Sequence, residues 1–206
     1  GSWGEWDKRQ KATLMPLKDA WEGSHKGDVM IARYVVREGE GITVSSPRLK
    51  KRSEVYNTLS ERGMRAECPI IFGDIDEPGL SKDAYSTECF MEEKKAIIEC
   101  YAEELGIYGY CTTRGGFHLL WVLSERITPE HSEEVYKALR KKLKSYNLDL
   151  DPACKDWTRL VRAPKVERDG YLTEKMPHFE IKTFGHIYTP HEVEAPQVTT
   201  TEGIQH

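Results

Sequence analysis

The chain has 206 residues, and its 30 basic and 34 acidic side chains leave a formal net charge of −4. With 38% hydrophobic and 10% aromatic residues it can bury a core, which excludes a wholly disordered chain. No apolar run approaches the roughly 18 residues that span a bilayer, and no signal-peptide pattern opens the chain. We therefore expect a cytoplasmic, globular protein with no membrane partner. The slight acidity by itself gives no sign of a nucleic-acid partner, because proteins that bind nucleic acids usually carry a basic excess.

The cysteine content argues against a disulfide scaffold. Five cysteines include no CxxC pair, and an odd number cannot all pair within one chain. No Cys or His pair has the spacing of a zinc finger. Gly1-Ser2 is typical of a cloning remnant, so we expect a longer natural protein, with a helicase or accessory domain outside this chain.

The first third of the chain predicts a less regular αβ unit. Residues 5–22 have helical periodicity, but Pro16 should kink or split that helix. Residues 29–36 are rich in β-formers, and a turn leads to a short strand at 42–44. Ser46-Pro47 then predicts the start of a helix over 47–62, ended by Gly63.

The rest of the chain alternates strands and helices. We predict a buried strand at 68–76 from its apolar run, a helix at 91–105 and a helix from 129 to about 146. Between the two helices, 107–111 and 117–123 predict a β-hairpin with a glycine-bearing turn. The stretches 157–164 and 178–188 resemble strands.

This order of elements indicates an α+β fold with an RRM-like (ferredoxin-like) antiparallel sheet and packed helices. We expect one domain over residues 3–189. It would comprise an N-terminal αβ unit at about 3–65 and a core at about 66–189, followed by a flexible tail or truncated linker at 190–206.

Two aspartates end the strand predicted at 68–76. Asp74 and Asp76 are two residues apart, so their side chains project from the same face of the sheet, beside Phe72. Like charges at the end of a buried strand repel each other unless they share a cation, and hard ions such as Mg²⁺ prefer oxygen ligands. The alternative is a pair of solvated carboxylates. A second DxD at Asp149 and Asp151 shows that this spacing alone is weak evidence for a metal site.

The predicted hairpin turn carries a candidate phosphate-binding group. Gly115 and Gly116 would leave the backbone bare beside His118, and Arg114 precedes them. Amide N–H groups, a guanidinium and an imidazole together suit a bulky anion such as a triphosphate. The alternative is an ordinary turn followed by a half-buried histidine.

A third element begins at Asp151 and continues into Arg159-Leu160-Val161-Arg162-Ala163-Pro164. Its aspartate would add a carboxylate to a metal site, and its arginines would bind phosphate groups. If 158–163 is a regular strand, Arg159 and Arg162 face opposite sides, and only one reaches the site. The alternative is a surface turn with solvated arginines.

The ordered triple resembles the catalytic motifs of the archaeo-eukaryotic primase superfamily, particularly the primase-polymerase domains of plasmids, phages and other mobile elements. There a strand ends in DxD or DxE, a Gly-Gly-x-His hairpin follows, and an Asp then leads into R-L-x-R-x-P. The resemblance covers about residues 66–185.

The resemblance implies roles for these residues and the primase fold for the chain. Asp74, Asp76 and Asp151 would be catalytic and hold two divalent ions, Mg²⁺ or Mn²⁺. The nucleotide-binding residues would be drawn from the hairpin and from the third element and its following loop: Arg114, Gly115, Gly116, His118, Arg159, Arg162 and Lys165. The substrates would be nucleoside triphosphates, a single-stranded DNA template and a primer strand.

Two departures from that family concern the third motif and zinc. Family members often continue with Asn-x-Lys, whereas Lys165-Val166-Glu167-Arg168 follows here, and no zinc-binding insert is visible. Asp149 and Asp156 remain alternatives to Asp151 as the third carboxylate.

The net charge is a sum over the whole chain, and it hides three clusters of basic residues. Arg48, Lys50, Lys51 and Arg52 crowd the start of the helix predicted at 47–62, where the helix dipole repels them, so a nucleic-acid backbone is a candidate partner. The run 155–168 is a second candidate, while 140–144 would simply cover a helix. Trp121 and Trp157 would either stack on bases or lie in the core.

We predict a template-directed nucleotidyltransferase, a DNA primase or DNA polymerase. The first alternative is a non-catalytic RRM-like module that binds single strands through exposed aromatic side chains. The second is a metal-dependent nuclease or replication-initiator endonuclease, although the His-x-His pair common in initiator nucleases does not occur.

Overall fold

The computed structural model describes residues 14–43, 52–77 and 84–190. Four α-helices lie in these ranges: α2 (Leu17–Glu22), α3 (Arg52–Glu61), α4 (Ala84–Leu105) and α5 (Pro129–Lys144). Two short 3₁₀ turns, η1 (Pro152–Lys155) and η2 (Thr173–Lys175), follow them along the chain. None of the described helices is both long enough and apolar enough to span a membrane.

One seven-stranded sheet organises the molecule. Its strands, in spatial order, are β10 (Ile181–Thr183), β5 (Gly109–Thr112), β6 (Gly116–Ile127), β4 (Met64–Asp76), β2 (Val35–Glu38) and β3 (Gly41–Thr43). These neighbours are antiparallel, whereas β11 (Ile187–Tyr188) pairs in parallel with β6. Two small pairs lie outside the sheet: β1 (Met30–Ile31) with β7 (Val161–Arg162), and β8 (Glu167–Arg168) with β9 (Tyr171–Leu172).

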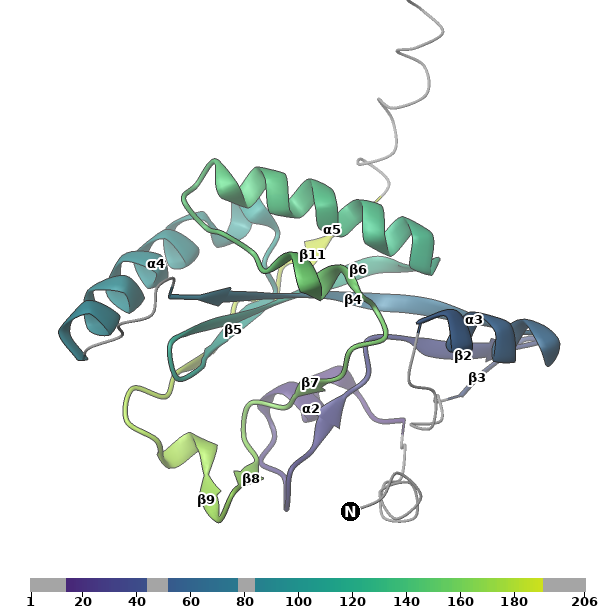
Figure 1. The fold of residues 1–206 in the computed structure, drawn as a ribbon, viewed down its shortest axis with the longest axis horizontal. Helices are drawn as coiled ribbons and strands as arrows, with labels where there is room; N and C mark the ends of the chain where they lie inside the picture. Colours follow the sequence, from purple (N-terminus) through teal and green to yellow (C-terminus); the bar gives the residue numbers. More distant parts are fainter. Residues whose placement is uncertain (1–13, 44–51, 78–83, 191–206) are drawn as a thin grey trace, which may run out of the picture.

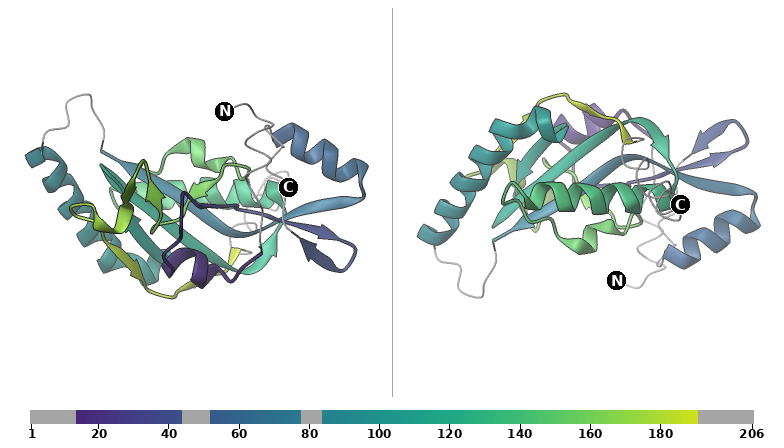
Figure 2. Two further views of the ribbon diagram at one scale, coloured as in Figure 1. Left: turned by 90° about the horizontal axis from the view of Figure 1, so that it is seen from below. Right: turned by 90° about the horizontal axis from the view of Figure 1, so that it is seen from above.

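Both faces of this sheet are covered, which explains the near-continuous apolar run of β4. Helices α4 and α5 lie on one face, whereas α2 and strands β7 to β9 lie on the other (Figure 1). Figure 2 shows α5 crossing the strands, with α4 beside it. Ile71 and Ile75 pack with the helices, while Phe72 packs with Trp21 and Val161 on the opposite face.

The structure confirms the predicted α+β class, and several of its elements are longer than predicted. The strand predicted at 68–76 begins at Met64, and the helix predicted at 91–105 begins at Ala84. The hairpin forms as expected, and Thr128 caps α5 by accepting a hydrogen bond from the backbone N–H of His131 at 3.2 Å. Pro16 lies directly before α2, at its N-cap position, and the residues 5–13 of the predicted helix lie outside the described ranges.

Other predicted elements are shorter or fall outside the described residues. Within 157–164 only Val161 and Arg162 form a strand, because that segment pairs with the two-residue β1 and not with the main sheet. Positions 5–13, 44, 47–51 and 191–206 lie outside the described ranges. The helix predicted from 47 is described from Arg52 onwards.

The N-terminal unit shares the sheet with the core. Strand β2 pairs with the first residues of β4, from Met64 to Glu67, so the boundary expected at 65/66 falls inside one continuous strand. A second link joins the segment after α2 to the loop after Pro164, because the backbone N–H of His25 donates to the carbonyl of Lys165 at 2.9 Å. The two parts therefore form one packed structure.

Candidate active site

The two carboxylates at the end of β4 lie beside the histidine of β6. In the antiparallel pairing Asp74 lies opposite His118, and Asp76 lies opposite Gly116. Strand β2 pairs only with the beginning of β4, and the backbone N–H of Asp151 donates to the carbonyl of Asp74 at 2.8 Å. The fold thus brings Asp74, Asp76, Asp151 and His118 to one end of the sheet.

Gly73 lets the segment that carries Asp151 approach β4. A Cβ atom at position 73 would lie 2.8 Å from Leu150 Cδ2 and 3.3 Å from the Trp121 ring. Leu150 is fully buried in that contact, and Asp151 follows it with an extended backbone, φ −62° and ψ 121°. Gly73 was not among the residues predicted to form the site; a glycine between Phe72 and Asp74, inside an apolar strand, is the signal in the sequence that could have indicated a close approach there.

Burial and like charges disfavour the ionised form of Asp74. Burial raises the pKa of its carboxyl to about 7, with further contributions from the negative charges of Asp76 and Asp151. The positive charge of Arg159 acts in the opposite direction. Oδ1 of Asp74 is buried and has no hydrogen-bond partner among the described residues, which leaves it available to a cation.

His118 connects this cluster to a neighbouring pocket. Its Nε2 lies 3.8 Å from Oδ1 of Asp74, and its ring packs edge-on against Phe72 with centroids 4.8 Å apart. Burial, assisted by the positive charge of Arg162, lowers the pKa of His118 to about 4. The imidazole is therefore neutral near pH 7, with one nitrogen that donates and one that accepts.

The charges of the two arginines in the segment 159–164 act on different residues. Arg159 precedes β7, is exposed and lowers the pKa of Asp74 by its charge, whereas Arg162 lies on the side of His118. Arg162 also forms a two-pronged ion pair with Asp28, with Nε–Oδ1 and Nη2–Oδ2 distances of 2.7 and 3.1 Å. The expectation that only one arginine reaches the site assumed a regular strand over 158–163, and that strand does not form.

The glycines of the hairpin have a packing role that the sequence prediction did not include. A Cβ at Gly116 would lie 1.7 Å from the carbonyl oxygen of Ile75, so only glycine permits this close approach of β6 to β4. The carbonyl of Gly115 accepts from the backbone N–H of Glu77 at 2.9 Å. Arg114 is exposed at the tip of the turn and lines the pocket.

Lys165, which the resemblance places among the nucleotide-binding residues, is hydrogen-bonded to the N-terminal unit. Its Nζ donates to the carbonyl of Glu22 at 3.0 Å, at the C-terminal end of α2, where a cation is favourable. The loop after the third motif therefore ties the N-terminal unit to the core.

The alternatives for the third carboxylate lie in other environments. Asp156 accepts from the backbone N–H and the hydroxyl of Thr158, at 3.0 and 2.7 Å, and so stabilises a local turn. Asp149 is exposed. Of the three candidates, Asp151 is the one whose backbone bonds directly to Asp74.

The structure places the two tryptophans and part of the basic clusters. Trp121 and Trp157 are buried in the core, so neither can stack on a base. Arg48, Lys50 and Lys51 lie outside the described residues, and Arg52 opens α3 with a side chain that is not described. In the cluster at 140–144, Arg140 does more than cover the helix, because its Nε donates to the carbonyl of Leu150 at 3.0 Å.

A pocket of about 720 Å³ opens beside His118. Its wall combines α4, the turn between β5 and β6, and the segment 162–180. Arg114, His118 and Arg162 supply polar groups, while Met91, Met176 and Phe179 supply apolar surface. A cavity of this size with a few converging polar groups suits a ligand as large as a nucleotide.

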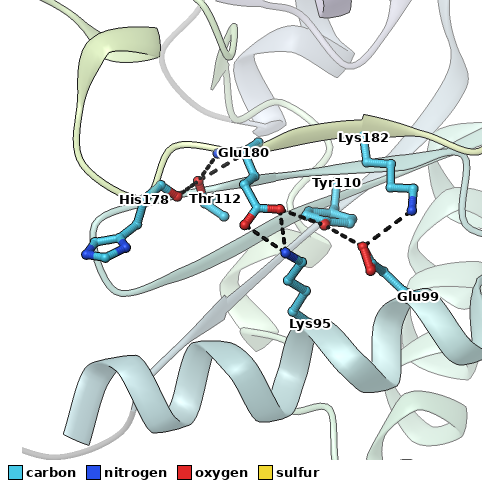
Figure 3. Close-up of polar contacts among 7 residues, drawn as sticks. All are labelled: Lys95, Glu99, Tyr110, Thr112, His178, Glu180 and Lys182. Carbon is cyan, nitrogen blue, oxygen red and sulfur yellow. Dashed lines mark hydrogen bonds and ion pairs between the residues drawn. The ribbon is translucent and has the colours of Figure 1, made fainter. Parts of the chain in front are cut away.

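One wall of the pocket is clamped by Glu180 (Figure 3). The Lys95 Nζ of α4 lies 2.8 and 2.7 Å from the two carboxylate oxygens of Glu180. The backbone of Glu180 pairs with Thr112, whose N–H donates to its carbonyl at 2.9 Å and whose hydroxyl accepts from its N–H at 2.8 Å. This clamp has no local signal in the sequence, because Lys95 and Glu180 are far apart in the chain.

The donor set fits a hard divalent ion. Asp74, Asp76 and Asp151 offer only oxygen ligands, and the buried Oδ1 of Asp74 has no hydrogen-bond partner among the described residues. No group of three or more His, Cys, Asp or Glu side chains within 14–43, 52–77 and 84–190 is already gathered around a single ion position. Mg²⁺ usually binds one or two carboxylates and completes its shell with water and substrate phosphates, which is consistent with this arrangement.

Comparisons with known proteins return fold-level similarity. No family model and no curated protein matches the chain. Among solved structures, it is similar to the polymerase domain of Mycobacterium tuberculosis Ligase D in complex with DNA, at 15% identity and a TM-score of 0.42, over 68% of this chain and 47% of that one. It is also similar to the AEP domain of the cyanophage S-2L primase-polymerase, at 13% identity and a TM-score of 0.38, over 78% of this chain and 85% of that one. The chain thus spans about half the length of the first of these structures.

Proposed function

We propose that this chain is a template-directed nucleotidyltransferase, a DNA primase or DNA polymerase that joins nucleoside triphosphates on single-stranded DNA. One observation carries the proposal: the negative charges of Asp76 and Asp151 both act on Asp74, which pairs with His118 at the edge of a nucleotide-sized pocket. Such a cluster is unfavourable by itself, as the raised pKa of Asp74 indicates, and becomes favourable when cations are shared.

Asp74, Asp76 and Asp151 would hold the ions. Two divalent cations, when bound, neutralise the phosphates and increase the nucleophilicity of a primer 3′-hydroxyl. The protein residues supply orientation. Asp74 and Asp76 project from one strand, and the backbone bond from Asp151 to Asp74 would hold the third carboxylate near them.

The triphosphate would extend from the carboxylates into the pocket. The neutral imidazole of His118 can donate one hydrogen bond to a phosphate oxygen without adding charge. Arg114 and Arg162 line the same pocket and would bind phosphate oxygens, Arg162 after sharing or releasing Asp28.

The binding-module alternative is not favoured by the sheet. That hypothesis requires exposed aromatic side chains on the face that carries Asp74 and His118. Phe72 on that face is buried, and Trp21 and Val161 pack against it.

A primer-extension assay with metal and nucleotide tests the proposal. With a primed single-stranded template, nucleotides and Mn²⁺, we expect extended products, and in a primer-free reaction labelled nucleotides reveal whether dinucleotides also form. Asp76→Asn should reduce the rate by about 100-fold or more, because it removes a metal ligand. Asp149→Asn is the matched control and should keep the wild-type rate.

Two outcomes would contradict the proposal. Full activity of Asp74→Ala and Asp76→Ala would show that these carboxylates do not bind the catalytic ions. Cleavage of single strands without added nucleotide, lost in the same variants, would favour the nuclease alternative.

A further inference from the structure

The segment that carries Asp151 is held by its backbone carbonyls. From α5, the hydroxyl of Tyr136 donates to the carbonyl of Asp151 at 2.5 Å, and Arg140 bonds the preceding carbonyl. From the N-terminal unit, Arg33 donates to the carbonyls of Cys154 and Asp156, at 2.6 and 2.8 Å. Donors from two distant parts of the chain therefore converge on one short segment.

Arg33 is unusual among these donors because its charge is buried. It lies between β1 and β2 with only 2% of its surface exposed, and burial lowers its pKa, although a guanidinium remains charged near neutral pH. A buried charge is strongly unfavourable unless it is well hydrogen-bonded. An arginine kept in such a place has a specific geometric task for which its two-pronged group is suited.

That task is visible in the turn η1. Arg33 binds carbonyls at the C-terminal end of this turn, where helical carbonyls lack partners within the helix. Asp151 caps the other end, with its Oδ1 accepting from the N–H of Ala153 at 2.9 Å. Since the N–H of Asp151 also binds β4, the position of η1 sets the position of the carboxylate.

We propose that Arg33 is a positioning residue for divalent-ion binding, and that it acts through η1 on Asp151. The inference rests on the proposed function, because it assumes that Asp151 contributes to the metal site. Residues that hold a metal ligand in place typically change metal affinity by 10- to 100-fold when they are substituted. The N-terminal unit would thereby belong to the metal site, although none of its residues is placed as a ligand.

Titration with Mn²⁺, followed by electron paramagnetic resonance, tests the inference without turnover. Arg33→Met keeps the length of the side chain and removes both hydrogen bonds, and we expect a dissociation constant raised about tenfold or more with an unchanged number of sites. Arg33→Lys should lie between wild type and Arg33→Met, because an ammonium cannot span both carbonyls as the guanidinium does. The control is Arg37→Met, which breaks an ion pair with Glu67 on β4, far along the strand from Asp74, and should bind Mn²⁺ as wild type does.

The outcomes separate this inference from the proposed function. If Arg33→Met binds Mn²⁺ with the wild-type dissociation constant, or only loses sites in proportion to unfolded protein, the inference is wrong. If wild type binds Mn²⁺ no more tightly than Asp76→Asn, the two-metal proposal itself fails. Should Arg33→Met not fold, Arg33→Lys carries the test, and an unchanged dissociation constant there would also overturn the inference. Tyr136→Phe, which removes only the hydroxyl bonded to Asp151, shows separately whether another hydrogen bond to the same segment affects Mn²⁺ binding.

Discussion

At the scale of single residues, the site contains two groups whose pKa values shift in opposite directions. The pKa of Asp74 is raised to about 7 and that of His118 is lowered to about 4. Asp74 alone makes the folded state less stable as the pH rises from about 4 to 7, because the folded form then holds a proton that the unfolded form has lost. His118 alone makes the folded state more stable as the pH rises from about 4 to 6.5, because over that range only the unfolded form binds the proton and loses it as the pH increases.

These two effects nearly cancel in the wild-type protein without metal, and single substitutions should reveal them. When the pH is raised from 4.5 to 6.5, the free energy of unfolding of Asp74→Asn should increase relative to that of wild type. For His118→Gln it should decrease, and each change should be on the order of 2 kcal/mol. Urea denaturation of the three proteins at both pH values measures this directly. Equal pH dependence in all three would show that neither group has a shifted pKa.

Gly73 offers a test of how the third carboxylate reaches β4. Gly73→Ala places a methyl group against the buried Leu150, and overpacking of this kind typically costs about 1–3 kcal/mol. Because Leu150 adjoins Asp151, we also expect a drop of about tenfold or more in nucleotide incorporation. The readouts are a denaturation curve and a primer-extension rate.

Gly63→Ala is the matched control for that substitution. Gly63 has a φ of +70° and open space at its Cβ, so alanine strains the backbone by roughly 1–2 kcal/mol. It lies directly before β4, at the opposite end of the strand from the carboxylates, and should leave the rate unchanged. If both variants lose stability and activity in the same proportion, Gly73 has no special link to the site.

At the scale of elements, the clamp between α4 and the segment before β10 shapes one wall of the pocket. Lys95 and Glu180 are 36% and 45% exposed, so breaking their ion pair should reduce stability by less than about 1 kcal/mol. Because Lys95, Glu180 and the adjoining Phe179 all line the pocket, Lys95→Met should raise the KM for nucleotide several-fold with little change in kcat.

Lys137→Met is the corresponding control. It breaks a similarly exposed pair with Glu134 on α5, outside the pocket lining. Steady-state kinetics of both variants should show the KM effect in Lys95→Met alone. A change in kcat without a change in KM would mean that the clamp does not act on nucleotide binding.

The elements that could be predicted from the sequence are those whose signals are local. Alternation along β4 placed Asp74 and Asp76 on one face, and the glycine-bearing turn placed His118 on the paired strand. The bonds from Arg162 to Asp28 and from Lys165 to the carbonyl of Glu22 were not predictable in this way, because these partners lie far away in the sequence. Arg33 carried no signal at all, since only its burial in the folded chain shows what it binds.

At the scale of the whole molecule, the N-terminal unit and the core should not be separable. A chain of residues 66–206 would lose β2, Trp21 and Arg33, and would expose the face of the sheet that carries Phe72. We expect it to lack a cooperative thermal transition and to bind a hydrophobic dye such as ANS. A cooperative transition within about 5 °C of the full chain would contradict this prediction.

The pairing of β1 with β7 also has a consequence for synthesis on the ribosome. Met30 pairs with Arg162, so a growing chain must add about 130 residues before this contact can form. At about 5–20 residues per second, the early strands wait roughly 7–26 s for their partner. During that interval Trp21 and the buried Arg33 remain without the segments that cover them, which makes the nascent N-terminal unit a natural substrate for chaperones and predicts slow refolding from denaturant.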